Sequence, residues 1–415
     1  MTATSTIRLD LDALAGNLEA VAALDAADGT PLGIERLCAV VKADGYGLGA
    51  ARIAAAMHRI GVRRFAAYGV DEAIEVAEAS PASTVLVLQP LRTLGTGGGL
   101  PGLLSRGRLH LTAHQVGQVE ELARDAARLG VVLPLHLEVD TGMGRGGCDP
   151  DEAMSVLAAI AAEPRLRLAG LMTHLPDAVG DPISAIERGR RFERFVEDAG
   201  DLVPPDAVRH VAATASLGSA SLRFDQVRVG IAWIGYGSVA LAGRPDPMPL
   251  RPIVSWWSRL VQVRRLAAGR TVGYGCTVTT ERETVAGLVP VGYADGLPPT
   301  RGDEPHRLIV HGRMGPVAVP VLGRMNMDQC VVDLTDVGPF DDDAAVEIIS
   351  SDPASPASLD RVAARAWALP YQILCGLSSR IPRLLVAGTG DVSSSGGPTI
   401  PMAGAIDAAR RLGHG

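Results

Sequence analysis

One lysine at the end of an apolar run raises the first chemical question. Residues 36–42 (RLCAVVK) are typical of a buried strand, and Lys42 closes that strand just before a glycine-rich loop with Tyr46. An ammonium group is costly to bury unless it is paired or covalently used. Burial also lowers the pKa of a lysine, which makes its amine usable as a base or a nucleophile. The alternative is an ordinary strand-end lysine whose charge reaches solvent.

Other polar side chains occupy similar positions further along the chain. Asp140, His174 and Thr214 come at or just after the ends of strand-like runs, and Arg228 lies within the last of these runs. In a barrel of parallel strands the carboxyl ends meet on one face, and the active site lies there. We therefore expect these side chains to gather around Lys42.

The elements that position these residues follow a repeating pattern. Between about residues 10 and 240, eight strand-like runs alternate with amphipathic helical patterns; the runs cover residues 36–42, 64–69, 84–90, 108–113, 134–140, 167–174, 208–213 and 226–232. This repeat predicts an α/β fold with a (β/α)8 TIM-type barrel, and an open doubly wound sheet is the alternative. The strand-end residues favour the barrel.

Beyond about residue 245 the pattern changes to alternating strands with few helices. We therefore predict a barrel domain over residues 1–245, whose first strand can join the following domain, and a C-terminal mainly-β domain over residues 246–388. Residues 389–415 are rich in Ser, Gly and Pro at first and are expected to form a flexible tail.

The composition excludes several classes of function. The net charge of −7 argues against nucleic-acid binding, which needs a basic face. The five cysteines are scattered without a CxxC pair, so we expect reduced thiols and no metal site. The N-terminus lacks the basic and apolar segments of a signal peptide, and no apolar run approaches the roughly 18 residues of a membrane span. We expect a cytoplasmic protein that does not enter a membrane.

Around Lys42 the sequence resembles a known family. The stretch AVVKADGYGLGA (39–50) is similar to the pyridoxal-phosphate lysine motif of the alanine racemase family, whose members have fold type III. Further motifs follow in the family's order: LEVDTGMGR (137–145), MTH (172–174), VRVGIA (227–232), VGYGC (272–276), VPVGYADG (289–296), GRMNMDQ (323–329) and PYQILCGLSSRIPR (370–383). The resemblance spans nearly the whole chain and implies pyridoxal 5'-phosphate as the cofactor.

The resemblance implies a racemase that uses two bases. Lys42 would bond covalently to the cofactor aldehyde and, once substrate displaces it, act as a base on one face of Cα. Tyr274 would act on the opposite face, since racemisation removes a proton from one side and returns one to the other. In the family this tyrosine comes from the neighbouring subunit, so an obligate homodimer is implied. The substrate is by resemblance the amino acid alanine, and D-alanine is a peptidoglycan precursor.

The remaining cofactor contacts are also carried over from the family. Arg228 would donate to the pyridine nitrogen, which stays unprotonated, and His174 would hydrogen-bond and orient Arg228. The candidates for the phosphate are hydroxyls and backbone amides, namely Tyr46, Thr214, Tyr371, Gly230 and Ile231.

A third group of residues would handle the substrate. Arg145 and the amide of Met327 would hold its carboxylate, Tyr293 would stand at the entrance, and Asp328 would support the Met327 loop. Where many family members carry a lysine modified by carbon dioxide, this chain has Glu138. We expect Glu138 to supply that negative charge itself, directly or through a water, so that activity does not depend on carbon dioxide.

Four other positions depart from the family's pattern and make the pocket edge less polar: Ala213, Leu48, Leu175 and Ile234. They leave the cofactor chemistry intact but bear on the substrate. Three alternatives to an alanine racemase therefore stand: a racemase for another amino acid, a pyridoxal-phosphate decarboxylase or aldolase on the same fold, and a non-catalytic homologue that binds the cofactor.

Overall fold

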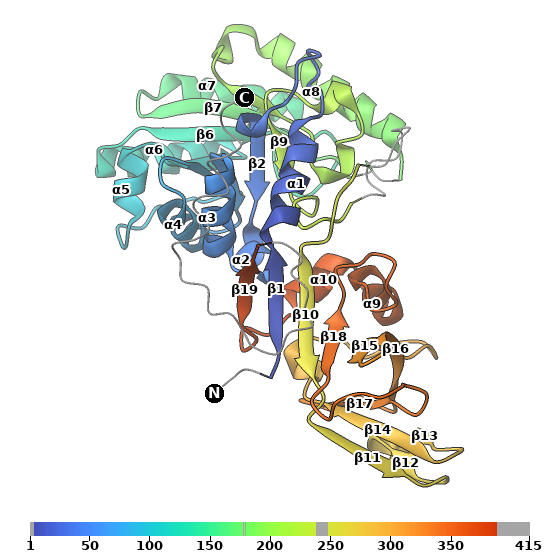
Figure 1. The fold of residues 1–415 in the computed structure, drawn as a ribbon. Coiled ribbons are helices and arrows are strands. Elements are labelled where there is room, and N and C mark those ends of the chain that lie inside the picture. The colour runs from blue at the N-terminus through green and yellow to red at the C-terminus, as the bar shows by residue number, and fades with distance from the viewer. Residues whose placement is uncertain (1–3, 177, 179, 238–247, 388–415) are drawn as a thin grey trace, which may run out of the picture.

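The chain folds into a barrel with a β-rich body below it (Figure 1). The computed structural model describes residues 4–176, 178, 180–237 and 248–387. The tail expected over residues 389–415 lies outside the described residues. Strands β1, β10 and β19 lie side by side where the two bodies meet.

Eight parallel strands form the barrel: β2 (Leu37–Val40), β3 (Arg64–Ala67), β4 (Thr84–Val87), β5 (Leu109–Ala113), β6 (Leu133–Glu138), β7 (Leu166–Met172), β8 (Val208–His210) and β9 (Val227–Val229). Their order in the sheet is β8-β7-β6-β5-β4-β3-β2-β9. A parallel bridge between Ala213 and Arg228 brings the two edges of this sheet together. The predicted barrel is therefore confirmed, and the open doubly wound sheet is wrong.

Helices cover the outside of the barrel: α1 (Leu11–Ala22), α3 (Ala50–Ile60), α4 (Val70–Ala79), α5 (Leu100–Ser105), α6 (Val116–Leu129), α7 (Pro150–Ala162) and α8 (Pro182–Ala199). Helix α6 shows the amphipathic pattern clearly, because its buried residues Val119, Leu122, Ala123 and Ala126 recur at helical spacing. Gly130 ends this helix in the left-handed conformation that glycine adopts at little cost.

The second body is built around a sheet of nine strands. Its members are β1 (Thr6–Asp10), β10 (Val254–Arg259), β11 (Gln262–Leu266), β14 (Thr284–Val289), β15 (Arg307–Gly312), β16 (Gly315–Leu322), β17 (Cys330–Asp333), β18 (Ala345–Ile349) and β19 (Arg383–Val386). A separate hairpin pairs β12 (Thr271–Val272) with β13 (Val278–Thr279), and the helices are α9 (Leu359–Ala366) and α10 (Pro370–Cys375). Strand β1 pairs with β10 and β19, so the start of the chain belongs to this sheet.

The buried side chain of Asn17 ties the two bodies together. Its amide nitrogen donates to the carbonyls of Trp233 and Arg251, and its oxygen accepts from the Arg251 amide at 2.8 Å. These hydrogen bonds stabilise the contact, because a buried side-chain amide without partners would destabilise the fold.

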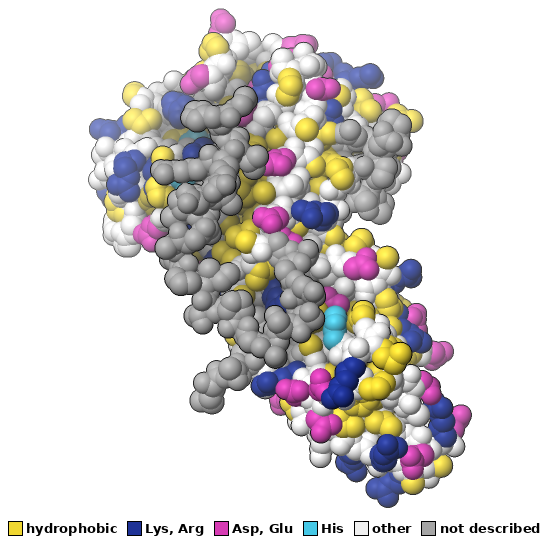
Figure 2. Space-filling model, viewed as in Figure 1, with side chains coloured by type: hydrophobic (Ala, Val, Ile, Leu, Met, Phe, Trp, Pro, Cys, Tyr) yellow, Lys and Arg dark blue, Asp and Glu magenta, His cyan; other side chains and the backbone are white. Residues whose placement is uncertain are grey.

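The surface carries no dominant charge in the face drawn in Figure 2, where Lys and Arg alternate with Asp and Glu. Within the described residues, no helix combines the length and apolar character that crossing a membrane requires. The same part of the chain contains no cluster of three or more metal-ligating side chains.

Candidate active site

Lys42 begins a left-handed turn at the mouth of the barrel. Strand β2 ends at Val40, and the segment α2 (Lys42–Gly47) follows it. Four consecutive residues from Ala43 to Tyr46 have φ between 53° and 61°. Because a non-glycine residue in this conformation costs about 1–2 kcal/mol, contacts elsewhere must hold the turn in place.

Two carboxylates hold this turn. Glu72 accepts a hydrogen bond from the Asp44 amide at 2.9 Å and one from the Tyr68 amide at 3.1 Å. Asp44 itself accepts from the amide of Ala50, the first residue of α3, at 2.8 Å. The conformation that presents Lys42 is therefore set by residues of the next βα unit, which the sequence motif alone did not identify.

Lys42 is the only lysine in the 415 residues. It lies in a pocket of about 630 Å³, whose other lining residues are Ala43, Tyr68, Gly69, Val70, Asp71, Glu72 and Gln89. Burial lowers the pKa of Lys42, and the nearby Arg145 lowers it further. An amine whose neutral form is favoured in this way can act as a nucleophile or base.

Arg228 is buried beneath the mouth and is held by uncharged acceptors. Its Nη1 lies 2.9 Å from His210 Nδ1 and donates to the His210 carbonyl at 2.6 Å. Its Nη2 donates to the carbonyls of Thr173 and Val211. In the described part of the chain no acceptor engages the remaining Nε–H of Arg228, which leaves one donor for a ligand.

The expected hydrogen bond between His174 and Arg228 is wrong, because His210 takes that position. His210 ends β8, the strand whose edge meets β9, whereas His174 lies beyond the end of β7. His174 still faces the same group of charges. Burial, together with Arg228 and Arg145, lowers the pKa of His174 to about 4, so this imidazole is neutral at physiological pH.

Hydroxyls and a backbone amide converge a short way from Lys42. A Cβ atom added at Gly230 would lie only 2.6 Å from the Tyr46 hydroxyl and 4.0 Å from Thr214 Oγ1. The Thr214 hydroxyl accepts from the amides of Gly230 and Ala232, which flank Ile231. This space is kept open by the absence of a side chain at Gly230.

Tyr371 reaches the same region from α10. A Cβ atom added at Gly47 would lie 2.4 Å from the carbonyl of Leu374, so α10 packs directly on the turn that follows Lys42. Tyr371 acts on the pKa of Tyr46, which burial raises well above its ordinary value. The Tyr46 phenol is therefore a protonated donor at neutral pH.

These groups fit the cofactor that the sequence implies. An amine, an unengaged guanidinium N–H and a set of hydroxyls match the aldehyde, the ring nitrogen and the phosphate of pyridoxal phosphate respectively.

Glu138 closes β6 on the same face and has a partner that sequence reasoning missed. His114 Nε2 lies 2.9 Å from Glu138 Oε2, and the Gly147 amide donates to His114 Nδ1 at 3.2 Å. Burial alone would raise the pKa of Glu138, but His114, Arg228 and Arg145 together bring it below the ordinary value. Glu138 is therefore ionised, with His114 as its contact and Arg145 further away.

Asp140 shapes the loop that carries Arg145. Its carboxylate accepts from the amides of Gly142, Met143 and Gly144 at 2.8, 2.6 and 2.8 Å. Arg145 itself is exposed. Asp140 thus acts on the backbone of the loop, as a carboxylate in a tight turn commonly does.

The structure does not bring Tyr274 to Lys42 within one chain. Tyr274 lies between β12 and β13, which Figure 1 shows at the end of the β-rich body far from the barrel. Its side chain is 69% exposed. Arg324 packs against the glycines on either side of it, and its guanidinium comes within 3.5 Å of a Cβ added at Gly275.

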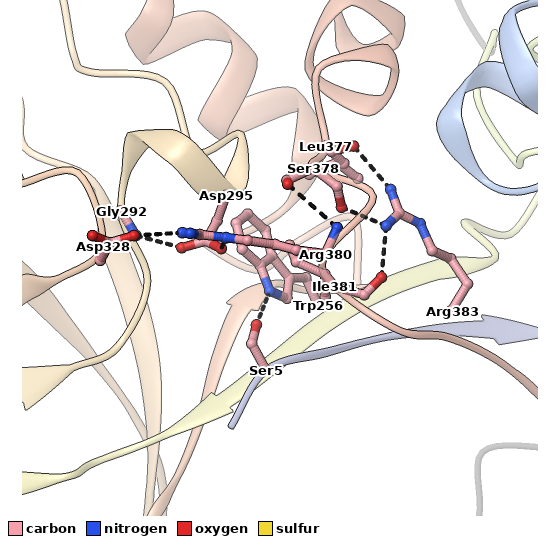
Figure 3. A network of polar contacts seen from close by, with 10 residues as sticks. All are labelled: Ser5, Trp256, Gly292, Asp295, Asp328, Leu377, Ser378, Arg380, Ile381 and Arg383. Carbon is pink, nitrogen blue, oxygen red and sulfur yellow. Dashed lines mark hydrogen bonds and ion pairs between the residues drawn. The ribbon is translucent and has the colours of Figure 1, made fainter. Parts of the chain in front are cut away.

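Tyr293, Met327 and Asp328 lie on two loops of the β-rich body. Arg380 joins these loops by pairing with Asp295 on one and Asp328 on the other (Figure 3). Arg380 pairs with Asp295 at 2.7 Å and with Asp328 at 2.8 Å. Asp295 also accepts from the Gly292 amide at 2.9 Å.

The same two loops are also bonded through their backbones. The amides of Tyr293 and Ala294 donate to the carbonyls of Asn326 and Met327. Both Tyr293 and Met327 remain about half exposed in the single chain.

The departures from the family's pattern lie mainly in the core. Leu48 and Ile234 are fully buried, and Leu175 is 7% exposed. The Ala213 amide donates to Ser216 Oγ at 3.0 Å. The expectation that Leu48 and Ile234 line the pocket edge is therefore wrong, because both side chains pack into the hydrophobic core.

Comparisons with protein families match almost the whole described chain. Residues 9–238 match the model for the alanine racemase N-terminal domain, and residues 253–385 match the model for its C-terminal domain. An alanine racemase of Symbiobacterium thermophilum is 34% identical over 300 residues, which cover 71% of this chain and 77% of the relative. One of Streptomyces coelicolor is 36% identical over 288 residues, 67% of this chain and 71% of the relative.

Solved structures have the same fold. The alanine racemase of Streptomyces lavendulae superposes with a TM-score of 0.79 at 29% identity, covering 94% of this chain and 98% of that structure. A structure from Bartonella henselae, described as an alanine racemase with covalently bound pyridoxal phosphate, gives a TM-score of 0.75 at 24% identity and covers 92% and 100% of the two chains.

Proposed function

The chain belongs to the alanine racemase family, and from this membership we propose how its own residues carry out the reaction. It is a pyridoxal-phosphate-dependent alanine racemase, an isomerase that interconverts L- and D-alanine. The observation that carries the site assignment is that its only lysine lies in the pocket at the mouth of the barrel.

We propose that the amine of Lys42 bonds to the aldehyde of pyridoxal phosphate. When bound, the cofactor would withdraw electrons from the substrate and so acidify the substrate's Cα–H. Arg228 would point its free Nε–H at the ring nitrogen. A guanidinium keeps its proton, so the ring nitrogen stays unprotonated and the electron withdrawal is moderate. His174 would lie beside the ring as a neutral imidazole.

At the other end of the site, five residues would bind the phosphate. The hydroxyls of Tyr46, Thr214 and Tyr371 and the amides of Gly230 and Ile231 would be the donors, since a dianion needs several hydrogen bonds and tolerates close backbone approach only where no side chain intervenes. Gly230 satisfies that condition.

Two bases would move the substrate proton. Lys42 Nζ would take or return it on one face of Cα, and Tyr274 Oη would do so on the other. Because Tyr274 lies far from the barrel of its own chain and is largely exposed, we propose that it completes the site of a second copy. The active form is then an obligate homodimer.

The substrate carboxylate would lie between the barrel of one subunit and the β-rich body of its partner. Arg145 would supply a cation, with Glu138 behind it as a fixed negative charge, and the Met327 amide would supply a further donor from the partner. Tyr293 would narrow the entrance, and Asp328 would hold the Met327 loop through Arg380.

The two domains would therefore have different roles in the site. Residues 1–245 would bind the cofactor, except that β1 pairs within the C-terminal sheet, and residues 246–388 would supply the second base. We propose a cytoplasmic enzyme, in keeping with five free cysteines.

The single lysine makes the cofactor assignment directly testable. Borohydride reduction of the holoenzyme should add one pyridoxyl group per chain, on Lys42, as shown by peptide mass spectrometry. Lys42→Arg keeps the positive charge but should carry no adduct and should not incorporate solvent deuterium at Cα of alanine. An adduct on the α-amino group alone would overturn the assignment.

Mixing two inactive variants tests the shared site. Lys42→Ala and Tyr274→Phe should each abolish racemisation, but a heterodimer of the two has one site with both bases intact. Random reassembly of equal amounts should therefore restore about a quarter of wild-type activity. No restoration, with heterodimers verified by mass, would mean that Tyr274 acts within its own chain or not at all.

A further inference from the structure

Three histidines, of which His136 and His210 are buried and His110 is partly buried, form a hydrogen-bonded column under Arg228. His210 Nε2 lies 2.8 Å from His136 Nδ1, and His136 Nε2 lies 2.8 Å from His110 Nδ1. The three residues come from β8, β6 and β5. The column therefore runs from Arg228 toward the amino ends of the strands, which form the floor of the barrel.

A glycine in the intervening strand makes room for this column. Gly170 lies in β7, between β6 and β8, and a Cβ atom there would lie 2.5 Å from His136 Nδ1. Without a side chain at Gly170, the imidazoles of His136 and His210 meet across β7. The contact between these two imidazoles therefore depends on residues of three strands, β6, β7 and β8.

The arginine determines where every proton in the column lies. A guanidinium can only donate, so Arg228 forces His210 Nδ1 to accept. His210 must then carry its proton on Nε2 and donate to His136, which by the same rule donates from Nε2 to His110. All three imidazoles are fixed as Nε2–H tautomers whose N–H bonds point away from Arg228.

This order places the electron-rich side of each ring toward the cation. Among the described residues no carboxylate hydrogen-bonds to Arg228, so the aligned imidazoles and carbonyls solvate its charge directly, while Glu138 favours that charge through a longer-range attraction. Burial lowers the pKa of His110 to about 4 and the pKa values of His136 and His210 further. The column is therefore uncharged at neutral pH.

We propose that the column formed by His110, His136 and His210 is a positioning device for Arg228, which fixes the guanidinium so that its Nε–H faces the cofactor ring. His110 lies at the far end of the column, where its Nδ1 accepts the hydrogen bond from His136 Nε2. This contact fixes the tautomer of His136, and His136 Nδ1 in turn accepts from His210 Nε2 and fixes the tautomer of His210. The inference rests on the proposed role of Arg228 at the ring nitrogen. It adds a remote residue, on the floor of the barrel, that acts on the cofactor only through other side chains.

The protonation pattern can be measured without the cofactor. Long-range 1H–15N correlation spectra of the apoenzyme with 15N-labelled histidine report the tautomer of each ring. We expect Nε2–H for all three residues between about pH 6 and pH 9, with assignments from single histidine substitutions. An Nδ1–H tautomer or an imidazolium at His210 would overturn the inference.

Variants at His110 test the effect on the cofactor site. His110→Leu removes the acceptor for the His136 N–H, and we expect the dissociation constant for pyridoxal phosphate to rise about tenfold and the absorption maximum of the bound cofactor to shift. His110→Gln should restore both, because its amide oxygen can accept that hydrogen bond. His311→Leu, which removes a half-buried histidine whose ring packs at a tilt against Trp257 outside the barrel, is the control and should leave both unchanged.

Two results distinguish this inference from the proposed function. If Arg228→Leu leaves the cofactor's affinity and absorption unchanged, the role of Arg228 itself is wrong. If Arg228→Leu alters them but His110→Leu, folded by circular dichroism, does not, the column does not position Arg228. Should His110→Leu fail to fold, the tautomers of the wild-type protein and the His110→Gln variant decide the question, since Gln must retain wild-type cofactor properties.

Discussion

His114 and Glu138 face each other at the mouth of the barrel, with Nε2 of the histidine 2.9 Å from Oε2 of the glutamate. Because the Gly147 amide donates to His114 Nδ1, the proton of this imidazole lies on Nε2, the nitrogen nearer to the carboxylate. His114, Arg228 and Arg145 together lower the pKa of Glu138 and so favour its negative charge. The pair supplies a fixed charge that needs no modification of the chain.

Glu138→Gln should weaken the binding of alanine without abolishing turnover. The amide keeps the shape of the glutamate side chain but removes the charge that supports Arg145. A loss of about 1 kcal/mol would raise KM roughly fivefold and change kcat less. Steady-state kinetics with and without added bicarbonate provide the measurement, and bicarbonate should not affect the wild type. The exposed Glu163→Gln is the control; equal KM values for all three proteins would contradict the role of Glu138.

Gly230→Ala should reduce the affinity for the cofactor. The added methyl group would lie 2.6 Å from the Tyr46 hydroxyl, so either the tyrosine or the backbone must move. Overpacking of this kind costs about 1–3 kcal/mol, which corresponds to a loss of affinity of about 5-fold to 150-fold. Fluorescence titration of the apoenzyme measures it. Gly117→Ala in α6, where the methyl group meets nothing within 4 Å, should bind the cofactor as the wild type does.

The pKa of Lys42 should be measurable free of interference, because no other lysine is present. Reductive methylation of the apoenzyme with 13C-formaldehyde would label Lys42 and the α-amino group only. We expect a pKa below the ordinary lysine value of about 10.4, since burial and the Arg145 cation both disfavour the charged amine. Arg145→Met should raise it. A pKa at or above the ordinary value would show that Lys42 is neither desolvated nor close to Arg145.

Arg380→Leu should loosen the two loops that carry Tyr293 and Met327. The substitution leaves the buried carboxylate of Asp295 without its ion pair and frees Asp328. We expect the free energy of unfolding to fall by about 1–3 kcal/mol and KM for alanine to rise. Urea denaturation and steady-state kinetics measure these changes. As a control, Arg313→Leu removes an exposed ion pair with Asp341 and should change neither the free energy of unfolding nor KM. Identical effects of the two variants would refute the specific role of Arg380.

Stability should fall on acidification through the histidine column. His110 has a pKa of about 4 in the folded chain against about 6.5 when unfolded. Between these values the unfolded state binds more protons, so the free energy of unfolding decreases as pH drops from about 6.5 to about 4. At pH 5 the loss from this residue is about 2 kcal/mol. Urea denaturation at fixed protein concentration should show a shallower decrease for His110→Gln; an unchanged slope would mean that His110 titrates normally in the folded chain.

Much of the fold and part of the site follow from local patterns. The eight strand-like runs correspond to the eight barrel strands, because buried parallel strands need continuous apolar runs between amphipathic helices. Lys42 and Thr214 could be named because strand ends are recognisable in the local sequence, whereas Tyr46 and Gly230 were named from the resemblance to the family. The sequence also shows that Lys42 is the only lysine, which singles it out as the side-chain amine that can bond to an aldehyde.

Other parts of the site depend on which strands become neighbours. His210 occupies the position beside Arg228 that was expected for His174, because the closing edge of the barrel joins β8 to β9. His110, His136 and Gly170 are far apart in the sequence and carry no shared motif. Their contact exists only once β5, β6, β7 and β8 are aligned in register.

The sequence by itself determined which segments form the barrel strands and in what order the reactive side chains follow along the chain. It also determined which lysine can bond to an aldehyde. These features depend on residue type and local periodicity. Tertiary structure alone decided the partners: Glu138 with His114, Arg380 with two loops, and Arg228 with a column of histidines. Hydrogen bonds depend on ångström-scale distance and direction, and these are fixed only when distant strands pack against one another.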